Sequence, residues 1–260
     1  MIGVFDSGIG GLSVVKGIFR YLPQYPIIYF GDTARFPYGI KGPEVIKGYA
    51  RENVQFLIDK GAKVIVVACN TVSAVALEDL RQEFSIPIFG VIEPAVNCAI
   101  SLTRNKKVGV IGTRATINSN IYEKKIRGAN PQIKVYSQAC PLLVSLVEEG
   151  WNKQPETKSI LAKYLRLFKS KKIDTLVLGC THYPFIKNLI QKEVGVKVQL
   201  IDSGQEVALF LREFLMHNPV LNLAGEGEKP HQFFVSDISG NFQKIAQKWL
   251  GKKIILSLKK

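Results

Sequence analysis

The sequence predicts an α/β fold of two similar, doubly wound domains with mainly parallel sheets and a functional site in the cleft between them. Short β-branched runs alternate with longer amphipathic segments almost from end to end, which is typical of βαβ units. The runs 64–68 and 176–178 are continuously apolar, as expected for central strands that helices cover on both faces. Segments 64–71 and 175–182 also resemble each other, since each is an apolar strand that leads into a Cys, a polar residue and the start of a helix. The chain is therefore predicted to contain two related halves.

The predicted strands follow one another along the whole chain. β-branched runs place them near residues 2–5, 27–31, 63–68, 107–111, 133–136, 174–178, 197–201 and 232–235. Most of these runs precede an amphipathic segment, which predicts a crossover helix. Segment 90–94 is the expected passage into the second domain and segment 201–204 the expected return. We therefore predict a discontinuous first domain at 1–93 plus 206–260 and an inserted second domain at 94–205.

The composition is that of a globular protein. Of 260 residues, 47% are hydrophobic and 22% are charged, which is enough to bury a core and excludes disorder as the main state. No apolar run reaches the roughly 18 residues of a membrane-spanning helix, and no basic segment precedes the apolar N-terminus. We therefore expect a cytoplasmic protein with no membrane partner.

The chain carries a strong positive charge. Thirty-five Lys and Arg against 21 Asp and Glu give +14, a field that attracts nucleic acid, anionic membranes or small acidic substrates. The basic residues are dispersed along the chain, with short runs only at positions such as 106–107 and 171–172. This pattern is more typical of a solvated surface than of a nucleic-acid-binding stripe.

Four cysteines form no CxxC pair, and their spacing to the three histidines fits no zinc pattern. Without a secretory signal a disulfide framework is not expected, so all four are predicted to be reduced thiols and no metal site is predicted. Cys98 lies in an apolar-periodic stretch and Cys140 at a strand-to-helix junction, which favours a structural role for both.

A glycine motif follows the first predicted strand. Gly8, Gly10 and Gly11 suggest a dinucleotide-binding turn, with Asp32 as its carboxylate, but Ser13 stands where the third glycine is needed. The alternative, which we favour, is a tight strand-to-helix turn whose amides face a ligand carboxylate. A P-loop is excluded because no GxxxxGK[ST] motif occurs.

Two cysteines occupy matching positions where buried strands end. In parallel sheets ligands bind beyond the carboxyl ends of the strands, so Cys69 and Cys180 are candidates for chemistry rather than two core residues. Each precedes a predicted helix, whose dipole favours the thiolate and lowers the pKa of the thiol. Asp6 is a candidate to orient or deprotonate one thiol, and His182 the other.

Two thiols on two halves suit a particular reaction. A pair of bases on opposite sides of one carbon removes a proton from one face and returns it to the other, which inverts the configuration. An amino acid's α-hydrogen is weakly acidic, so the site must also supply oriented donors and exclude water. Side chains of this kind follow the predicted strands: Ser7, Asn70, Thr71, Thr113, Thr116 and Thr181. This chemistry requires no cofactor.

The motifs together resemble those of the glutamate racemase family, cofactor-independent enzymes that interconvert L- and D-glutamate. The similarity runs through nearly the whole chain. The segments that carry it are 5–13 (FDSGIGGLS), 31–39 (GDTARFPYG), 68–71 (ACNT), 90–94 (GVIEP), 112–116 (GTRAT) and 178–184 (LGCTHYP).

The resemblance implies roles for individual residues. In that family two cysteines are the acid/base pair, so Cys69 is implied to act on the D-enantiomer and Cys180 on the L-enantiomer. Asp6 is implied to assist Cys69, and His182 with a Glu to assist Cys180. The match to the family's Leu-Val-Glu-x-Gly segment selects Glu148, although Ser145 replaces a Pro of the pattern, and the sequence alone favours Glu148 and Glu149 as a solvated pair. The implied substrate-binding residues are Asp6, Ser7, Pro37, Tyr38, Gly39, Asn70, Thr71, Thr113, Thr116, Thr181 and His182.

The resemblance also implies a cellular role and partners. The family supplies D-glutamate for bacterial peptidoglycan, and its members are cytoplasmic and usually homodimeric. Because the chain starts almost at its first strand, we expect no activation of the kind that needs an N-terminal extension. Two alternatives stay open: a related racemase that acts on aspartate, hydantoins or arylmalonates, and a nucleic-acid-binding or gyrase-modulating role based on the charge of +14. A single-cysteine decarboxylase is disfavoured because both cysteines are present.

Overall fold

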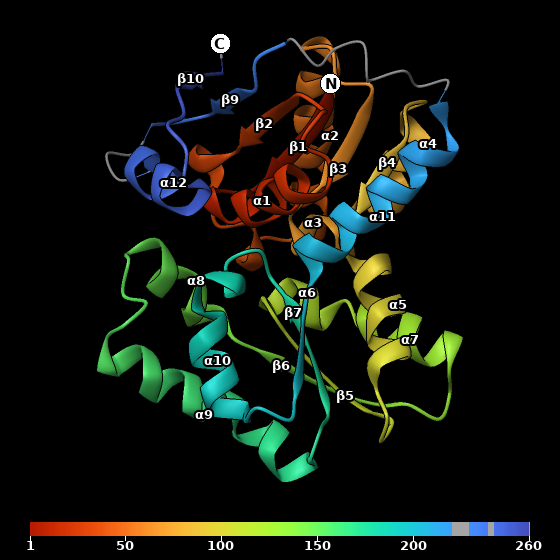
Figure 1. Ribbon diagram of the computed structural model, residues 1–260, viewed down its shortest axis with the longest axis vertical. Helices are drawn as coiled ribbons and strands as arrows, with labels where there is room; N and C mark the ends of the chain where they lie inside the picture. The colour runs from red at the N-terminus through yellow and green to blue at the C-terminus, as the bar shows by residue number, and fades with distance from the viewer. Residues whose placement is uncertain (220–228, 239–241, 260) are drawn as a thin grey trace.

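Two parallel sheets organise the protein (Figure 1). The computed structural model describes residues 1–219, 229–238 and 242–259, and the following bounds refer to these ranges. The first sheet has the order β10-β9-β2-β1-β3-β4, and its strands are β1 (Ile2–Asp6), β2 (Ile27–Gly31), β3 (Val64–Val67), β4 (Ile88–Gly90), β9 (Gln232–Val235) and β10 (Leu256–Leu258). The second has the order β6-β5-β7-β8, with β5 (Lys107–Gly112), β6 (Lys134–Ala139), β7 (Thr175–Gly179) and β8 (Gln199–Asp202). The mainly parallel α/β fold predicted from the sequence is confirmed.

Helices connect the strands as crossovers. They are α1 (Leu12–Tyr21), α2 (Pro43–Asp59), α3 (Asn70–Val75), α4 (Leu77–Glu83), α5 (Ile92–Leu102), α6 (Arg114–Asn118), α7 (Ile121–Ala129), α8 (Pro141–Glu148), α9 (Pro155–Lys171), α10 (Lys187–Val194), α11 (Ser203–His217) and α12 (Phe242–Leu250). Short 3₁₀ turns are η1 (Ile9–Gly11), η2 (Thr33–Arg35), η3 (Tyr38–Ile40) and η4 (Tyr183–Ile186). Local chemistry fixes several helix starts. Pro43, Pro141 and Pro155 each open a helix where a missing N–H does no harm, and Asp202 caps α11 by accepting a hydrogen bond from Gly204 N at 3.0 Å.

Both faces of each sheet are covered, which explains the continuously apolar strands. On β1, Val4 packs into the cluster that holds α1 and α11, and Phe5 into the opposite cluster with α2. The first of these clusters continues through α5 to Val110 and Val177 of the second sheet. Helices α8, α9 and α10 cover the other face of the second sheet. The layers of the two halves are therefore joined by one continuous core along α5 and α11 (Figure 1).

The strand register aligns the functional positions. Asp6 pairs with Gly31 and Phe5 with Val67, so the chain leaves β1, β2 and β3 at one edge of the first sheet. In the second sheet Gly112 pairs with Gly179, so the residues after β5 and β7 also lie together. The carboxyl edges are thus where side chains from separate parts of the chain can meet.

The predicted elements agree with the structure except in two places. Each of the eight predicted strands is present, with ends shifted by at most a few residues, but β4 and β10 were not predicted. Segment 90–94, predicted as a passage between domains, contains the last residue of β4 and the start of α5, the helix that leads to β5 of the second sheet. The predicted boundaries after residues 93 and 205 fall inside α5 and α11, and 220–228, 239–241 and 260 lie outside the described residues. The division into two domains stays a prediction.

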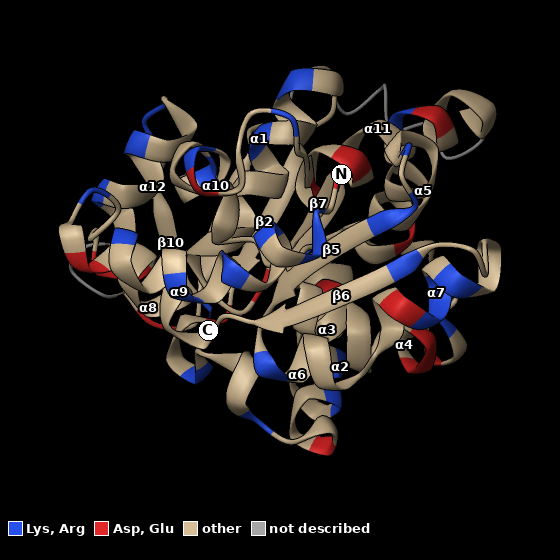
Figure 2. Ribbon diagram, turned by 90° about the horizontal axis from the view of Figure 1, so that it is seen from below, with Lys and Arg blue, Asp and Glu red and all other residues tan. Residues whose placement is uncertain are grey.

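Charge is spread over many elements. Figure 2 shows Lys and Arg on separate helices and strands of the described chain, with Asp and Glu between them. Within the same residues, no helix combines the length and the apolar character that crossing a membrane requires.

Candidate active site

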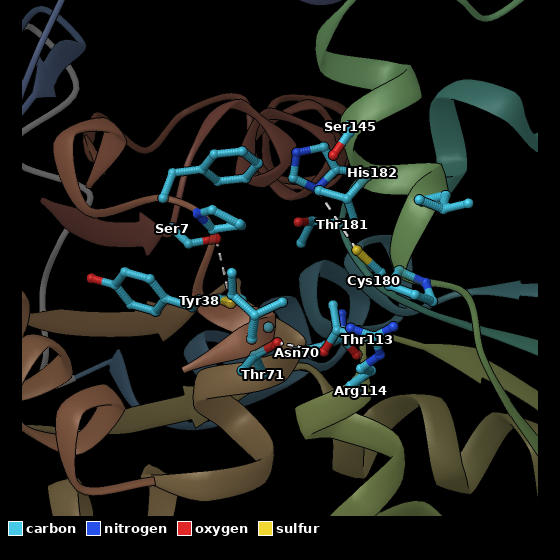
Figure 3. A pocket seen from close by; sticks show the side chains of 18 of the residues that line it. Ser7, Tyr38, Asn70, Thr71, Thr113, Arg114, Ser145, Cys180, Thr181 and His182 are labelled. Atoms are coloured by element: carbon cyan, nitrogen blue, oxygen red, sulfur yellow. Dashed lines mark hydrogen bonds between the residues drawn. The ribbon is translucent and has the colours of Figure 1, made fainter. Parts of the chain in front are cut away.

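A cavity of about 370 Å³ lies between the two halves. Pockets that bind small molecules have volumes of roughly 300–1,000 Å³, so the space suits a small metabolite. Its walls come from both sheets: Ser7, Phe36–Ile40 and Cys69–Thr71 from the first half, and Thr113, Arg114, Pro141, Leu142, Val144, Ser145, Tyr164 and Cys180–His182 from the second. Figure 3 shows these side chains converging from the two sides. Both cysteines singled out from the sequence therefore face one space.

Cys69 lies two residues beyond the end of β3 and directly precedes α3. Its thiol is buried and donates a weak hydrogen bond to Ser7 Oγ at 3.8 Å. Burial, and secondly the negative charge of Asp6, raises the pKa of Cys69 to about 12. Desolvation of the thiolate raises the pKa by more than the hydrogen bond from the Val72 N–H, at the start of α3, lowers it. Cys69 is therefore a protonated thiol at neutral pH.

Cys180 has a different environment. Its Sγ lies 3.7 Å from Nδ1 of His182, whose Nε2 lies 2.6 Å from Oε1 of Glu148. Burial alone would lower the pKa of His182, but its contacts with Cys180 and Glu148 raise it well above its usual value. His182 is then an imidazolium beside the Cys180 sulfur. The first helical turn after Cys180 begins only at Tyr183, so the helix start predicted directly after Cys180 lies further along the chain.

Glu148 belongs to this chain of contacts. It lies at the end of α8, and a quarter of its side chain is exposed. The interpretation of Glu148 and Glu149 as a solvated pair is wrong for Glu148 and agrees with the exposed position of Glu149. The sequence alone could not show this, because Glu148 and His182 are 34 residues apart.

Asp6 connects the two halves. Its carboxylate accepts hydrogen bonds from Gly8 N at 3.1 Å and from the Thr181 hydroxyl at 3.2 Å. Burial raises the pKa of Asp6 to about 6, opposed chiefly by the positive charge of His182. Asp6 therefore affects Cys69 through its charge, while its hydrogen bond reaches the residue next to Cys180.

Polar side chains on the cavity wall are held in place by one another. The hydroxyl of Thr113 lies 2.9 Å from that of Thr71 and 3.0 Å from that of Thr116. Asn70 accepts a hydrogen bond from Tyr122 Oη at 2.7 Å and donates one to Ser203 Oγ at 3.2 Å. Since both ends of the Asn70 amide are engaged, its orientation is fixed before any ligand arrives.

The predicted binding residues are mostly on the wall. Ser7, Pro37, Tyr38, Gly39, Asn70, Thr71, Thr113, Thr181 and His182 line the cavity, whereas Asp6 and Thr116 lie behind it. Sequence reasoning missed Arg114, Tyr122, Leu142 and Tyr164. Arg114 directly follows Thr113, which was considered, but Tyr122 and Tyr164 lie within helices and gave no signal. Among the described residues, no group of three or more metal-binding side chains occurs.

Glycines allow the two halves to approach closely beside the cavity. A Cβ atom on Gly10 would lie 2.6 Å from His182 Nδ1, and one on Gly39 would lie 2.6 Å from Thr113 Cβ. Real Cβ atoms do not make such short contacts. Gly10 of the motif after β1 and Gly39 therefore allow close packing of the halves around the site.

Comparisons with known proteins agree with this geometry. A model of the Asp/Glu/hydantoin racemase family matches residues 2–210. The glutamate racemase of Geobacter metallireducens is 47% identical, and the match covers 97% of this chain and 93% of that one. Among solved structures, a glutamate racemase isoform from Bacillus anthracis has a TM-score of 0.93 at 39% identity, covering 100% of this chain and 97% of the other. The glutamate racemase from Francisella tularensis, solved in complex with D-glutamate, has a TM-score of 0.89 at 42% identity, covering 99% and 95%.

Proposed function

The chain belongs to the Asp/Glu/hydantoin racemase family, and we propose that it interconverts L-glutamate and D-glutamate without a cofactor. One observation carries this proposal: Cys69 and Cys180, which follow strands of different sheets, line the same cavity, one beside the Ser7 hydroxyl and the other beside the His182 imidazole. Relatives named glutamate racemase, at 47% and 44% identity over nearly the whole chain, support glutamate as the substrate.

The two cysteines supply the proton transfers. With L-glutamate bound, the Cys180 thiolate takes the α-proton, so the Cα–H bond breaks and an S–H bond forms. The Cys69 thiol then gives its proton to the opposite face of Cα and becomes a thiolate. The product is D-glutamate, and the enzyme is left in the form that accepts D-glutamate for the reverse reaction. His182 stabilises the charge on Cys180, with Glu148 behind it.

The cavity wall stabilises the carbanion-like intermediate. Donors that are already oriented cost no reorganisation when negative charge develops on the substrate. Asn70, Thr71 and Thr113 meet this requirement because each has a fixed partner, and Thr116 holds the Thr113 hydroxyl from behind the wall. Burial of the thiols excludes bulk water, which would otherwise compete for the proton.

The cellular role follows from the same proposal. D-Glutamate made by this reaction would serve peptidoglycan synthesis in the cytoplasm, and we expect a homodimer. Light scattering on a size-exclusion column measures the oligomeric state.

The direct experiment is incubation of purified, pyridoxal-phosphate-free protein with L-glutamate or D-glutamate, followed by chiral chromatography. We expect both reactions to reach a 1:1 mixture, with deuterium appearing at Cα in D₂O. Aspartate, a hydantoin and an arylmalonate should react slowly or not at all. Conversion of aspartate in preference to glutamate would refute the substrate assignment, and no conversion of any substrate would refute the function. Salt-dependent retention on a DNA column would support the second, nucleic-acid-binding role.

A further inference from the structure

A buried carboxylate that the proposed reaction does not use lies behind the cavity wall. Asp32 directly follows β2, is completely buried and does not line the cavity. A buried charge is costly unless it is paired and hydrogen-bonded. Its partners therefore indicate what it does.

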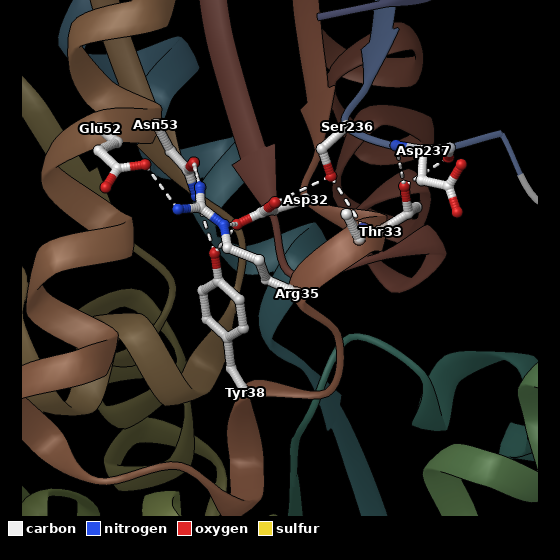
Figure 4. Close-up of polar contacts among 9 residues, drawn as sticks. Asp32, Thr33, Arg35, Tyr38, Glu52, Asn53, Ser236 and Asp237 are labelled. Carbon is white, nitrogen blue, oxygen red and sulfur yellow. Dashed lines mark hydrogen bonds and ion pairs between the residues drawn. The ribbon is translucent and has the colours of Figure 1, made fainter.

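The Asp32 carboxylate binds three side chains. Oδ2 accepts hydrogen bonds from Arg35 Nε at 2.7 Å and from the Tyr38 hydroxyl, and Oδ1 accepts one from Ser236 Oγ at 2.9 Å. Figure 4 shows these groups meeting at Asp32. Ser236 follows β9, so the carboxylate joins the loop after β2 to a segment about 200 residues further along the chain.

Tyr38 is held at its far end by this cluster. Its hydroxyl donates to Asp32 and accepts from Asn53 Nδ2 at 3.1 Å, so both hydrogen-bonding functions are used. Burial, and then the charge of Asp32, raises the pKa of Tyr38 well above its usual value, which keeps the hydroxyl a donor. The Tyr38 ring points away from the cavity centre (Figure 3), while Tyr38 and Gly39 form part of the wall.

The guanidinium of Arg35 secures the other side. It donates to Glu52 Oε2 at 2.5 Å and to Asn53 Oδ1 at 3.1 Å, and it lies 4.2 Å from the centre of the Tyr49 ring. These three partners belong to α2, so Arg35 holds the loop after β2 against this helix. Asp32 binds both Arg35 and Ser236, and it therefore joins the loop to α2 and to the segment after β9.

We propose that Asp32 is a positioning residue that sets the affinity for glutamate by holding Tyr38 and Gly39 in the cavity wall. This rests on the proposed function and on the substrate-binding role that the family resemblance implies for Tyr38 and Gly39, both of which line the cavity. Asp32 has no contact with the reacting atoms. Its loss therefore weakens substrate binding and leaves the proton transfers at Cys69 and Cys180 intact.

The test is a comparison of Asp32→Asn, Tyr38→Phe and the double variant. A lost hydrogen bond to a charged group corresponds to about a tenfold effect, so KM for glutamate should rise about tenfold in each single variant while kcat changes less than about twofold. The Kd of D-glutamate from titration calorimetry should rise in parallel. Since Asp32 acts through Tyr38, the double variant should be no worse than Asp32→Asn.

Asp174→Asn is the matched control. Asp174 also accepts several hydrogen bonds, including those from Arg104 N at 2.7 Å and Asn105 N at 2.6 Å, but it lies at the amino end of β7, away from the cavity. It should lower the thermal midpoint and leave KM unchanged. A purely structural role for Asp32 would give that same pattern.

The outcomes separate the two proposals. If the parent protein converts glutamate but KM is unchanged in Asp32→Asn, or if the two single effects multiply in the double variant, the positioning role is overturned. If the parent converts no glutamate, the proposed function fails. Should Asp32→Asn not fold, Tyr38→Phe decides alone, because it leaves the contact between Asp32 and Arg35 in place.

Discussion

Glu148→Gln tests whether the carboxylate behind His182 contributes to the reaction. Oε1 of Glu148 lies 2.6 Å from His182 Nε2, and only 2% of the histidine side chain is exposed. Two unit charges about 4 Å apart at an effective dielectric constant of about 20 interact by about 4 kcal/mol. Glutamine keeps a hydrogen bond, and a quarter of the Glu148 side chain faces solvent, so we take about half of this value.

A loss of about 2 kcal/mol corresponds to about a 30-fold fall in kcat/KM for L-glutamate. The pKa of His182 is raised in the parent, so the imidazolium's contribution to stability is present at low pH and disappears as pH rises through the folded pKa. Glu148→Gln lowers that folded pKa. The alkaline decline of activity and of stability should therefore begin at a lower pH.

Initial rates by chiral chromatography between pH 6 and 10, with thermal unfolding at each pH, measure both effects. Glu149→Gln, at the exposed neighbouring position, is the matched control and should behave like the parent. If Glu148→Gln keeps kcat/KM within a factor of two and the pH profile does not move, the argument about His182 is refuted.

The paired thiols, the buried carboxyl group and a glycine contact offer three further tests. Cys69→Ala and Cys180→Ala should each lower kcat/KM at least about 10²-fold, the usual contribution of a positioned acid or base, and parent-like activity would remove that sulfur from the mechanism. Asp6→Asn should flatten the pH dependence of the unfolding free energy between pH 3.8 and about 6, since in that window the folded parent holds a proton that the unfolded chain releases, so its stability falls as pH rises. Equal slopes in denaturant titrations at several pH values would count against this. Gly10→Ala should cost about 1–3 kcal/mol of stability in the same titrations and slow turnover, because a Cβ would overlap the imidazole beside Cys180. Gly128→Ala, where a Cβ meets nothing within 4 Å, should be neutral or stabilising, and equal losses in the two variants would contradict the packing argument.

The fold was predictable where a strand was long enough to show a clear hydrophobic pattern. The apolar runs of β3 and β7 identify central strands because they are buried on both faces. The strands β4 and β10 have only three residues each and lie at sheet edges, where partial exposure weakens the pattern. Each pairs with a strand earlier in the chain, Ile88 with Ile65 and Leu256 with Phe233, and no local pattern shows these pairings.

The site was predictable to the extent that strand ends determine it. Cys69, Thr113 and Cys180 follow strands, so parallel topology brings them to the carboxyl edges. The contact between Glu148 and His182 depends on how α8 lies against the end of β7, which no local pattern shows. The protonation of Cys69 depends on burial, which overrides a local helix effect.

The two sulfurs have unlike surroundings, a hydroxyl and a carboxyl group on one side and an imidazolium on the other. Mirror-image forms of glutamate have the same free energy in water, so their equilibrium constant is one. The ratio kcat/KM must then be identical for both forms, however asymmetric the protein is. The asymmetry can appear only in the separate values of kcat and KM for each enantiomer. It also determines which enantiomer meets an enzyme whose donating thiol already carries its proton.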